Sequence, residues 1–288
     1  MNNNTNRVLY NNINQTLFIP YYISKKKRIN KLVLSGGGIK GISFIGIIKA
    51  LDELCLLNNI KTYAATSIGT IICFLVIIGY SYKELIKITT LFDFNQLYNF
   101  DINNLITNYG LNNGNSIVIF LQKLLQKKQL NQDITLLELF KITNKKFIIT
   151  TTNINKKICE YLSYKTYPDL QIIQAIRMSI SLPFIFTPIK MNNYYYIDGG
   201  CSDNFPINIF KHQDKILGIY IDNDNCDINT FEDYGFNIIN TLISSNTTNS
   251  NIIKLIINIK ITKFNISDNQ KQELIKMGYE QILNYFNI

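Results

Sequence analysis

The sequence has little histidine and cysteine, and neither residue is arranged to hold a metal. Its 288 residues include one histidine, His212, and five cysteines that lie far apart and form no C-x-x-C pair. An odd, dispersed set of cysteines beside a single histidine argues against both a disulfide framework and a Cys/His metal site. We therefore expect reduced thiols in a cytosol-like compartment, no metal ion and no other cofactor.

Long hydrophobic runs are also missing. The most apolar stretch, Ile68 to Gly79, is much shorter than the roughly 20 residues that span a bilayer. The Asn-rich start of the chain, Met1 to Leu9, lacks the apolar core of a signal peptide. These absences predict a cytoplasmic location, with attachment to a membrane surface as the further expectation.

A basic N-terminal segment is the first feature that is present. The net charge of the chain is +9, which attracts anionic partners such as nucleic acid or an anionic membrane. The aromatic residues Phe18, Tyr21 and Tyr22 precede a cluster of four cations, Lys25, Lys26, Lys27 and Arg28. We interpret residues 1–30 as an arm that contacts anionic lipid, and we expect no nucleic-acid partner. A solvated basic arm and a nuclear-import signal are the alternatives.

The rest of the chain predicts an α/β fold. The composition, 47% hydrophobic and 17% charged, is typical of a globular protein. Short apolar strands alternate with segments of helical spacing, an order typical of a mostly parallel sheet covered by helices in a three-layer architecture. We expect residues 31–210 to form the main domain and residues 211–288 to complete it. The expected strands are 31–35, 62–66, 146–152, 158–163, 194–197, 216–221 and 252–261, and the expected helices are 39–57, 68–79, 116–129, 135–141, 168–179, 231–243 and 267–286.

A glycine-rich segment follows the first expected strand, Ser35-Gly36-Gly37-Gly38-Ile39-Lys40-Gly41. Glycines let backbone N–H groups approach a ligand closely, and the start of a helix favours negative charge. The segment fits the dinucleotide-binding pattern G-x-G-x-x-G. That motif also requires an acidic residue near the end of the second strand, and none is present there, which argues against a dinucleotide site. A P-loop would need Lys and then Ser or Thr after the final glycine. Gly41 is followed by Ile42 and Ser43 instead, which excludes a P-loop. An oxyanion hole and a tight turn without chemistry remain, and we expect the oxyanion hole.

Ser67 lies where the second expected strand meets an apolar helix, in Ala65-Thr66-Ser67-Ile68-Gly69. A nucleophile elbow lifts a serine hydroxyl clear of the sheet in a sharp turn, with small residues two positions before and after it. Gly69 supplies one of them, and Ala65 replaces the more usual glycine with one extra methyl group. Taken alone, such a serine is more often a helix N-cap.

Asp198 ends a later strand, in Tyr196-Ile197-Asp198-Gly199-Gly200. Taken alone, this segment predicts a turn aspartate. Together the three segments are more specific, because each lies at the carboxyl end of a predicted strand, where the active sites of open α/β sheets gather. We expect the glycine segment, Ser67 and Asp198 to meet in one crevice.

At these residues the sequence resembles the patatin-like phospholipases. The matching blocks, in the family's order, are Gly36 to Gly41, Thr66 to Gly69, Ala175 to Phe184, and Asp198 to Gly200 with Asn204-Phe205-Pro206. The resemblance covers about residues 32–209 and departs from the family at Ala65. It implies a patatin-like catalytic domain over residues 31–210. It also implies a serine lipid acyl hydrolase that cleaves ester-linked fatty acids from glycerolipids at a membrane surface.

The resemblance also assigns roles by position. It implies that Ser67 is the nucleophile and Asp198 the base of a dyad that works through an acyl-enzyme, without histidine. The implied oxyanion hole is Gly36, Gly37, Gly38, Lys40 and Gly41, the elbow is Ala65, Thr66, Ile68 and Gly69, and the Asp-Gly-Gly motif adds Gly199 and Gly200. The segment 80–115 is a candidate lid or acyl-chain wall by its position between the blocks.

Three alternatives stay open. His212 follows Ser67 and Asp198 in the chain order of a hydrolase triad, but it lies in a polar stretch, so we expect a solvated side chain. The fold could also belong to a catalytically weak or inactive lipid-binding protein, which the extra methyl of Ala65 favours. A dinucleotide-binding oxidoreductase is the third alternative.

Overall fold

The computed structural model describes residues 29–92, 100–211, 215–222, 228–229, 234, 237–238, 252–257 and 266–288. The basic cluster at 25–28, His212 and most of the helix expected at 231–243 lie outside these residues. None of the helices in the described ranges combines the length and the apolar character that crossing a bilayer requires.

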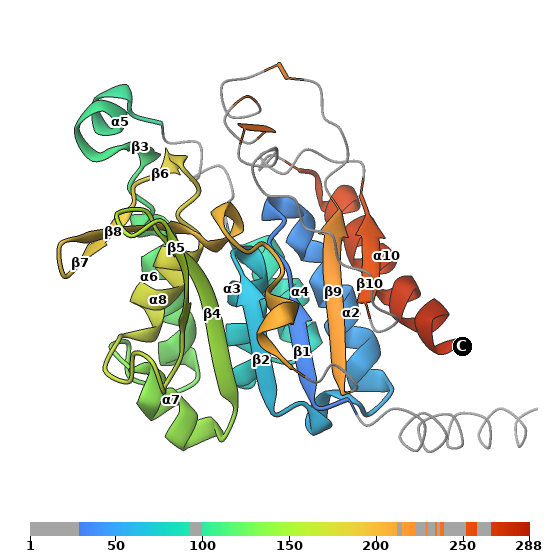
Figure 1. The fold of residues 1–288 in the computed structure, drawn as a ribbon. Coiled ribbons are helices and arrows are strands. Elements are labelled where there is room, and N and C mark those ends of the chain that lie inside the picture. Colours follow the sequence, from blue (N-terminus) through green and yellow to red (C-terminus); the bar gives the residue numbers. More distant parts are fainter. Residues whose placement is uncertain are drawn as a thin grey trace, which may run out of the picture.

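A central sheet of eight strands positions the functional residues (Figure 1). Its order is β10-β9-β1-β2-β4-β8-β7, and β5 pairs with β4 beside this path. The pairs that join β10, β9, β1, β2 and β4 are parallel, whereas the pairs β4–β5, β4–β8 and β7–β8 are antiparallel. The expected α/β class with a mostly parallel sheet is confirmed. The strands are β1 (Lys31–Leu34), β2 (Thr62–Thr66), β4 (Lys146–Asn153), β5 (Ile158–Leu162), β7 (Ile189–Met191), β8 (Tyr194–Asp198), β9 (Ile216–Asp222) and β10 (Ile252–Ile256).

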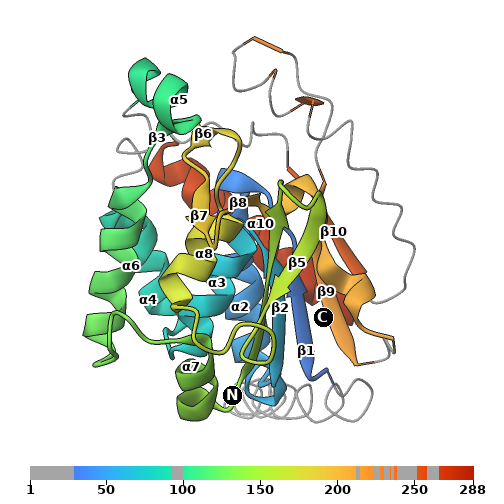
Figure 2. The same ribbon diagram turned by 60° about the vertical axis from the view of Figure 1, so that its left-hand side comes forward.

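Helices cover one face of this sheet, and Figure 2 shows α3, α4, α6 and α8 together on one side of it. Alternate strand residues such as Leu32 and Leu34 join the helices in one large apolar core, as expected when one face of a strand is buried. The α-helices are α2 (Ser43–Glu53), α3 (Ile68–Ile77), α4 (Tyr82–Leu91), α5 (Ile102–Asn108), α6 (Asn115–Lys127), α7 (Leu136–Thr143), α8 (Ile172–Ser179) and α10 (Asp268–Phe286), and the short 3-10 helices are η1 (Gly38–Ile42), η2 (Leu57–Asn59), η4 (Gly199–Cys201) and η5 (Pro206–Ile209).

The opposite face of the sheet carries a thinner layer. Val33 and Ala64, which alternate with the core residues, pack there against Phe205 and Ile207 in the segment that contains η5. In the part of the chain that the structure describes, this segment stands where a second layer of helices was expected. The sheet is still flanked on both faces, but unequally.

The expected helix from Pro168 begins four residues later, at Ile172. The reason lies in tertiary hydrogen bonds: the N–H groups of Leu136 and Leu137, at the start of α7, donate to the carbonyls of Leu170 and Pro168 at 2.9 and 3.1 Å. The Ile172 N–H likewise donates to the Ile134 carbonyl at 2.9 Å, instead of closing a helical turn with the carbonyl of Pro168. The pattern Ser267-x-x-Gln270 predicts a capping box at the start of α10, and the structure has it: Ser267 accepts from the Gln270 N–H and Gln270 accepts from the Ser267 N–H.

A small second sheet projects beyond the carboxyl ends of the parallel strands, together with α5 (Figures 1 and 2). It pairs β3 (Gly110–Asn112) with β6 (Phe184–Phe186). Glycines beside asparagines predict a turn or flexible segment at 108–115, but Gly110 lies in β3 and allows close pairing with β6. A Cβ atom on Gly110 would lie 2.2 Å from the Thr187 nitrogen.

The β7–β8 hairpin sets the position of β8. Its turn is only two residues long, because Met191 pairs with Tyr194 across it. Asn192 and Asn193 both have positive φ angles, 49° and 66°. This is the backbone of a type I′ turn, whose twist matches that of the strands and which asparagine tolerates.

Candidate active site

Ser67 occupies a strained turn between β2 and α3. Its φ and ψ angles are 52° and −125°, a conformation that non-glycine residues adopt rarely and mainly at functional sites. The turn is tight because α3 starts against β1. A Cβ atom on Gly69 would lie 2.6 Å from the Ser35 carbonyl oxygen. The Ala65 methyl is fully buried in the main core, so the fold accommodates the departure from glycine at that position.

Ser179 supports the turn from the end of α8. Its hydroxyl oxygen accepts a hydrogen bond from the Ser67 N–H at 3.0 Å and lies 3.1 Å from the Thr70 hydroxyl. A buried N–H group that lacked this partner would destabilise the turn. The hydroxyl therefore holds the strained backbone in place.

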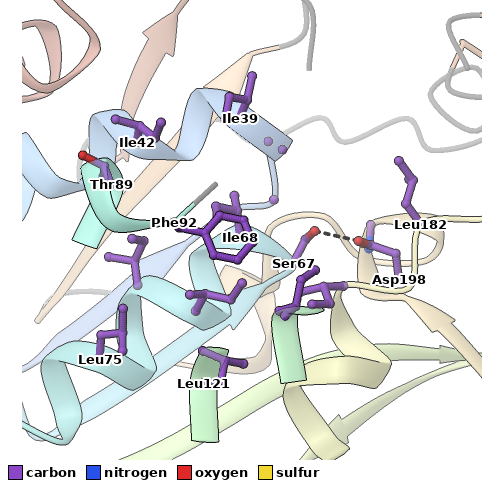
Figure 3. Close-up of a pocket in the computed structure, with 18 of the residues that line it drawn as sticks. Ile39, Ile42, Ser67, Ile68, Leu75, Thr89, Phe92, Leu121, Leu182 and Asp198 are labelled. Atoms are coloured by element: carbon purple, nitrogen blue, oxygen red, sulfur yellow. Dashed lines mark hydrogen bonds between the residues drawn. The ribbon is translucent and has the colours of Figure 1, made fainter. Parts of the chain in front are cut away.

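The hydroxyl of Ser67 points at Asp198 (Figure 3). Its Oγ donates a hydrogen bond to Asp198 Oδ2 at 2.6 Å, and Asp198 Oδ1 accepts one from the Gly200 N–H at 2.7 Å. Asp198 is only 4% exposed. Burial raises the pKa of this carboxyl from its ordinary value of 3.8 to about 6, while the hydrogen bonds from Ser67 and Gly200 act in the opposite direction. The carboxyl is thus unusually basic for an aspartate and still ionised at neutral pH.

The strand that carries Asp198 runs in a direction that differs from the expected one. β8 runs antiparallel to β4, so its carboxyl end does not coincide with those of the parallel strands. β8 is short, however, and pairs only with the last residues of β4. The register places Asp198 opposite Thr151, while Thr66 of β2 lies opposite Thr150. Ser67 and Asp198 are therefore level with each other on either side of β4.

The glycine segment lies directly against Ser67. A Cβ atom on Gly36 would be 3.2 Å from the Ser67 Cβ and 2.3 Å from Asn204 Oδ1. The Gly36 N–H itself donates to the Asn204 carbonyl at 3.1 Å, so it is not free to bind a ligand. Within the described part of the chain, the N–H groups of Gly37 and Gly38 make no hydrogen bond. They are the open donors of this loop.

Lys40 and Gly41, the other two residues expected in the oxyanion hole, contribute in different ways. The Lys40 N–H donates to the Gly37 carbonyl at 3.1 Å, and its buried side chain reaches the Asp222 carbonyl at 3.4 Å. Gly41 is required for packing, because a Cβ atom there would lie 2.4 Å from the Ile68 side chain. Both residues shape the loop, and neither presents an open N–H group to a ligand in the way that Gly37 does.

An apolar cavity opens beside the Ser67 hydroxyl. It has a volume of about 180 Å³ and runs from the glycine loop, Ser67 and Asp198 between η1, α3, α4 and α6. Figure 3 shows Ile68, Leu75, Thr89, Phe92 and Leu121 around it. From the segment 80–115, which was expected to form a lid or acyl-chain wall, α4 contributes Leu85, Ile88 and Thr89 to the lining of this cavity. A cavity lined mainly by apolar side chains, with Ser67 and Asp198 at one end, suits an apolar chain attached to a reactive head.

Sequence reasoning missed most of the cavity. The α6 residues that line it recur at helical spacing, which is also the spacing of ordinary core residues. No pattern distinguished them from the core.

The expected roles of Lys25, Lys26, Lys27, Arg28 and His212 concern residues outside the described ranges. In those ranges, acidic, cysteine and histidine side chains form no group of three that could hold a metal ion.

The chain is similar to several known proteins. The chain matches the model of the patatin-like phospholipase family over residues 32–211. It is 34% identical over 274 residues to a protein of Invertebrate iridescent virus 6 named "Probable lipid hydrolase 463L", which covers 89% of this chain and 92% of the relative. It is also 31% identical over 281 residues to uncharacterized protein R571 of Acanthamoeba polyphaga mimivirus, covering 89% and 93%.

Two solved bacterial structures have a similar fold. VipD of Legionella pneumophila has a TM-score of 0.62 at 19% identity, over 90% of this chain and 67% of that chain. ExoU of Pseudomonas aeruginosa has a TM-score of 0.53 at 16% identity, over 91% of this chain and 53% of that chain. The chain thus spans about half the length of ExoU, and these two likenesses concern the fold. The family match over more than half of the chain and the viral relatives above 30% identity establish that the chain belongs to the patatin-like phospholipase family.

Proposed function

We propose that this protein is a serine lipid acyl hydrolase of the phospholipase A or lysophospholipase type, which cleaves ester-linked fatty acids from glycerolipids. The observation that carries the proposal is the hydrogen bond of 2.6 Å from Ser67 Oγ to the buried Asp198 carboxylate. This pair lies at the mouth of an apolar cavity. The "lipid hydrolase" name of the viral relative and the family assignment support the same reaction.

The pairing of Ser67 with Asp198 compensates for the weak nucleophilicity of a serine hydroxyl. A serine hydroxyl is a weak nucleophile and needs a base within hydrogen-bond reach. An ordinary aspartate is a poor base, but the raised pKa of Asp198, about 6, lies near the value that suits a general base at neutral pH. Burial raises the pKa and also excludes water that would compete for the carboxylate.

In the acylation step, Ser67 Oγ forms a bond to the carbonyl carbon of the ester while its proton passes to Asp198 Oδ2. The carbonyl oxygen becomes negatively charged and is held by the N–H groups of Gly37 and Gly38, a stabilisation of roughly 3–4 kcal/mol for each such donor. When this intermediate collapses, the bond to the leaving oxygen breaks, and Asp198 returns its proton to that oxygen. The products are an alcohol and an ester of Ser67.

In the deacylation step, a water molecule gives its proton to Asp198 and its oxygen attacks the acyl carbon. Collapse releases the fatty acid, and the proton returns to Ser67 Oγ. The acyl chain lies in the apolar cavity throughout, where each buried methylene contributes about 0.8 kcal/mol to binding. The remainder of the lipid stays outside the cavity.

The decisive experiment is labelling with a fluorophosphonate probe, which reacts with activated serines. We expect the wild-type chain to be labelled, and Ser67→Ala and Asp198→Asn to lose nearly all labelling and all release of fatty acid from lipid. Ser163→Ala, on the turn after β5, is the matched control and should label normally. An unlabelled wild-type protein that still binds lipid would establish the alternative of a non-catalytic lipid-binding protein.

His212→Ala separates the dyad from a triad. We expect this variant to keep most of its activity, because the proposed proton transfers involve Asp198 alone. A loss as large as that of Asp198→Asn would assign the base to the histidine.

The proposal extends to the rest of the chain. Residues 31–210 form the catalytic domain, and residues 211–288 complete the same domain, in which β9 pairs directly with β1. The protein is cytoplasmic in this proposal. Its arm at 1–30 contacts anionic lipid on the cytoplasmic side of a membrane through the basic cluster.

A further inference from the structure

Helix α5 exposes large apolar side chains to solvent. Ile102 and Ile106 are 70% and 71% exposed, and Tyr109, which follows the helix, is 59% exposed. Residues four apart lie on the same side of a helix, so the two isoleucines form one apolar face. Exposed apolar patches of this kind mark interaction sites.

The exposed face is held firmly in position. Asn104 Nδ2 donates to the Gly110 carbonyl at 2.5 Å, and the Asp101 N–H donates to the Leu111 carbonyl at 2.8 Å. The buried Arg177 guanidinium of α8 donates to the carbonyls of Asn113 and Thr187 at 3.0 and 3.1 Å, and so clamps the loops that follow β3 and β6. The helix is a fixed part of the surface, so its isoleucines point outward permanently.

The apolar surface continues onto neighbouring elements. Phe184 of β6 pairs with Gly110, next to Tyr109, and its side chain is exposed. The Tyr109 ring meets the Tyr195 ring edge-on at 6.0 Å, and the Tyr195 carbonyl accepts from the Ile154 N–H at 3.1 Å. Ile154 and Ile158, at the β4–β5 turn, are also exposed. We call this set the apical surface: Ile102, Ile106, Tyr109, Ile154, Ile158 and Phe184.

Cations and tyrosines border the apical surface. Lys156 and Lys157 lie in the β4–β5 turn and Lys190 lies on β7, whereas Asp101 is the only acidic residue among 100–112, 153–158 and 182–195. The Lys156 ammonium lies 4.4 Å from the centre of the Tyr194 ring, and that of Lys190 lies 5.5 Å from the centre of the Tyr195 ring. Exposed isoleucines rimmed by tyrosines and lysines have the chemistry of a protein surface that sits in the headgroup region of an anionic bilayer.

The apical surface also adjoins the cavity. Leu182 and Phe186 line the cavity, and Phe184, which lies between them in the chain, is exposed at the surface. Figures 1 and 2 show α5, β3 and β6 projecting at the edge of the sheet where the parallel strands end. Ser67 lies at the same edge.

We infer that the apical surface docks the protein onto anionic lipid bilayers, with Ile102 and Ile106 inserted among the headgroups. This inference deepens the proposed function, on which it rests, since docking there brings lipid acyl chains to the cavity mouth. A protein partner with an apolar groove is the competing occupant. The charge pattern favours the bilayer, because it adds three cations around an apolar centre.

The test measures flotation of full-length Ser67→Ala protein with vesicles, so that no lipid is hydrolysed. Vesicles are phosphatidylcholine alone or mixed with phosphatidylglycerol. We expect Ile102→Ser combined with Ile106→Ser to weaken binding by about tenfold, and Lys156→Gln combined with Lys157→Gln to reduce the preference for the anionic vesicles. The matched control is Ile142→Ser, a 62% exposed isoleucine on α7 at the opposite edge of the sheet, which should bind normally.

A second measurement keeps the two proposals separable. In the active chain, the isoleucine variant should lose activity on vesicles but still hydrolyse a short-chain ester in solution. Failure of the wild-type chain to hydrolyse either substrate would reject the proposed function, while flotation would still decide docking. Vesicle binding that is absent, or equal in the isoleucine variant and the Ile142→Ser control, overturns the docking inference and leaves a protein partner as the occupant.

Discussion

Replacing Asp198 by asparagine should abolish activity and stabilise the fold. Burial raises the pKa of Asp198 from 3.8 to about 6, so the folded protein binds this proton more tightly than the unfolded chain does. Stability therefore falls as pH rises from about 4 to about 6 and stays constant above that. A shift of about two units corresponds to roughly 3 kcal/mol. Asparagine removes this penalty and can keep both hydrogen bonds, by accepting from Gly200 and donating to Ser67.

The expected gain in unfolding free energy is about 3 kcal/mol near neutral pH, roughly half of that at about pH 5, and less than about 1 kcal/mol at about pH 4. Urea denaturation followed by far-ultraviolet circular dichroism measures it, with equal m-values as the condition for comparison. Asp52→Asn removes an exposed carboxyl of α2 and should change stability by less than about 0.5 kcal/mol. An Asp198→Asn variant that is less stable at neutral pH, or whose gain does not shrink toward acid, would refute the reasoning.

Two further predictions concern catalysis. With Asp198 as the base, log kcat/KM for a soluble ester should rise with pH at a slope of one up to an apparent pKa of about 6 and then level off. At about pH 5, roughly a tenth of the plateau value should remain. A profile that is flat down to about pH 5 would contradict this role. Leu121→Trp should fill the cavity and shift the preference toward shorter acyl chains, measured as kcat/KM over a series of esters, while the volume-conserving Leu121→Met keeps the wild-type profile; an unchanged profile in the tryptophan variant would place the acyl chain elsewhere.

The sequence was informative wherever chemistry requires a particular residue at a turn. Gly36 and Gly69 are examples, because a side chain at either of them would collide with neighbouring backbone or with Asn204. Such requirements are local, so short motifs at strand ends predicted the α/β class and the residues that meet at the site. Ser67 and Asp198 are 131 positions apart, and two observations linked them: each follows a predicted strand, and the blocks occur in the family's order.

Features that depend on tertiary contacts were beyond the sequence. The direction of β8 is one, since a strand of alternating residues pairs equally well in either sense. The late start of α8 is another, because it results from hydrogen bonds with α7. The cavity is a third: the side chains that line it, such as Leu121, have the same spacing and polarity as those of a filled core. Whether helices leave space between them depends on their positions, which periodicity does not encode.

The two-residue turn of the β7–β8 hairpin has a consequence for how the catalytic geometry can change. Side chains alternate along β8, so a shift of its pairing by one residue would turn Asp198 to the other side of the sheet, away from Ser67. Asn192 and Asn193 lie six and five positions before Asp198, yet their backbone angles set the register in which β8 pairs with β7. Insertion of a single residue in this turn would thus turn the Asp198 carboxylate away from Ser67 without altering any residue that contacts the lipid.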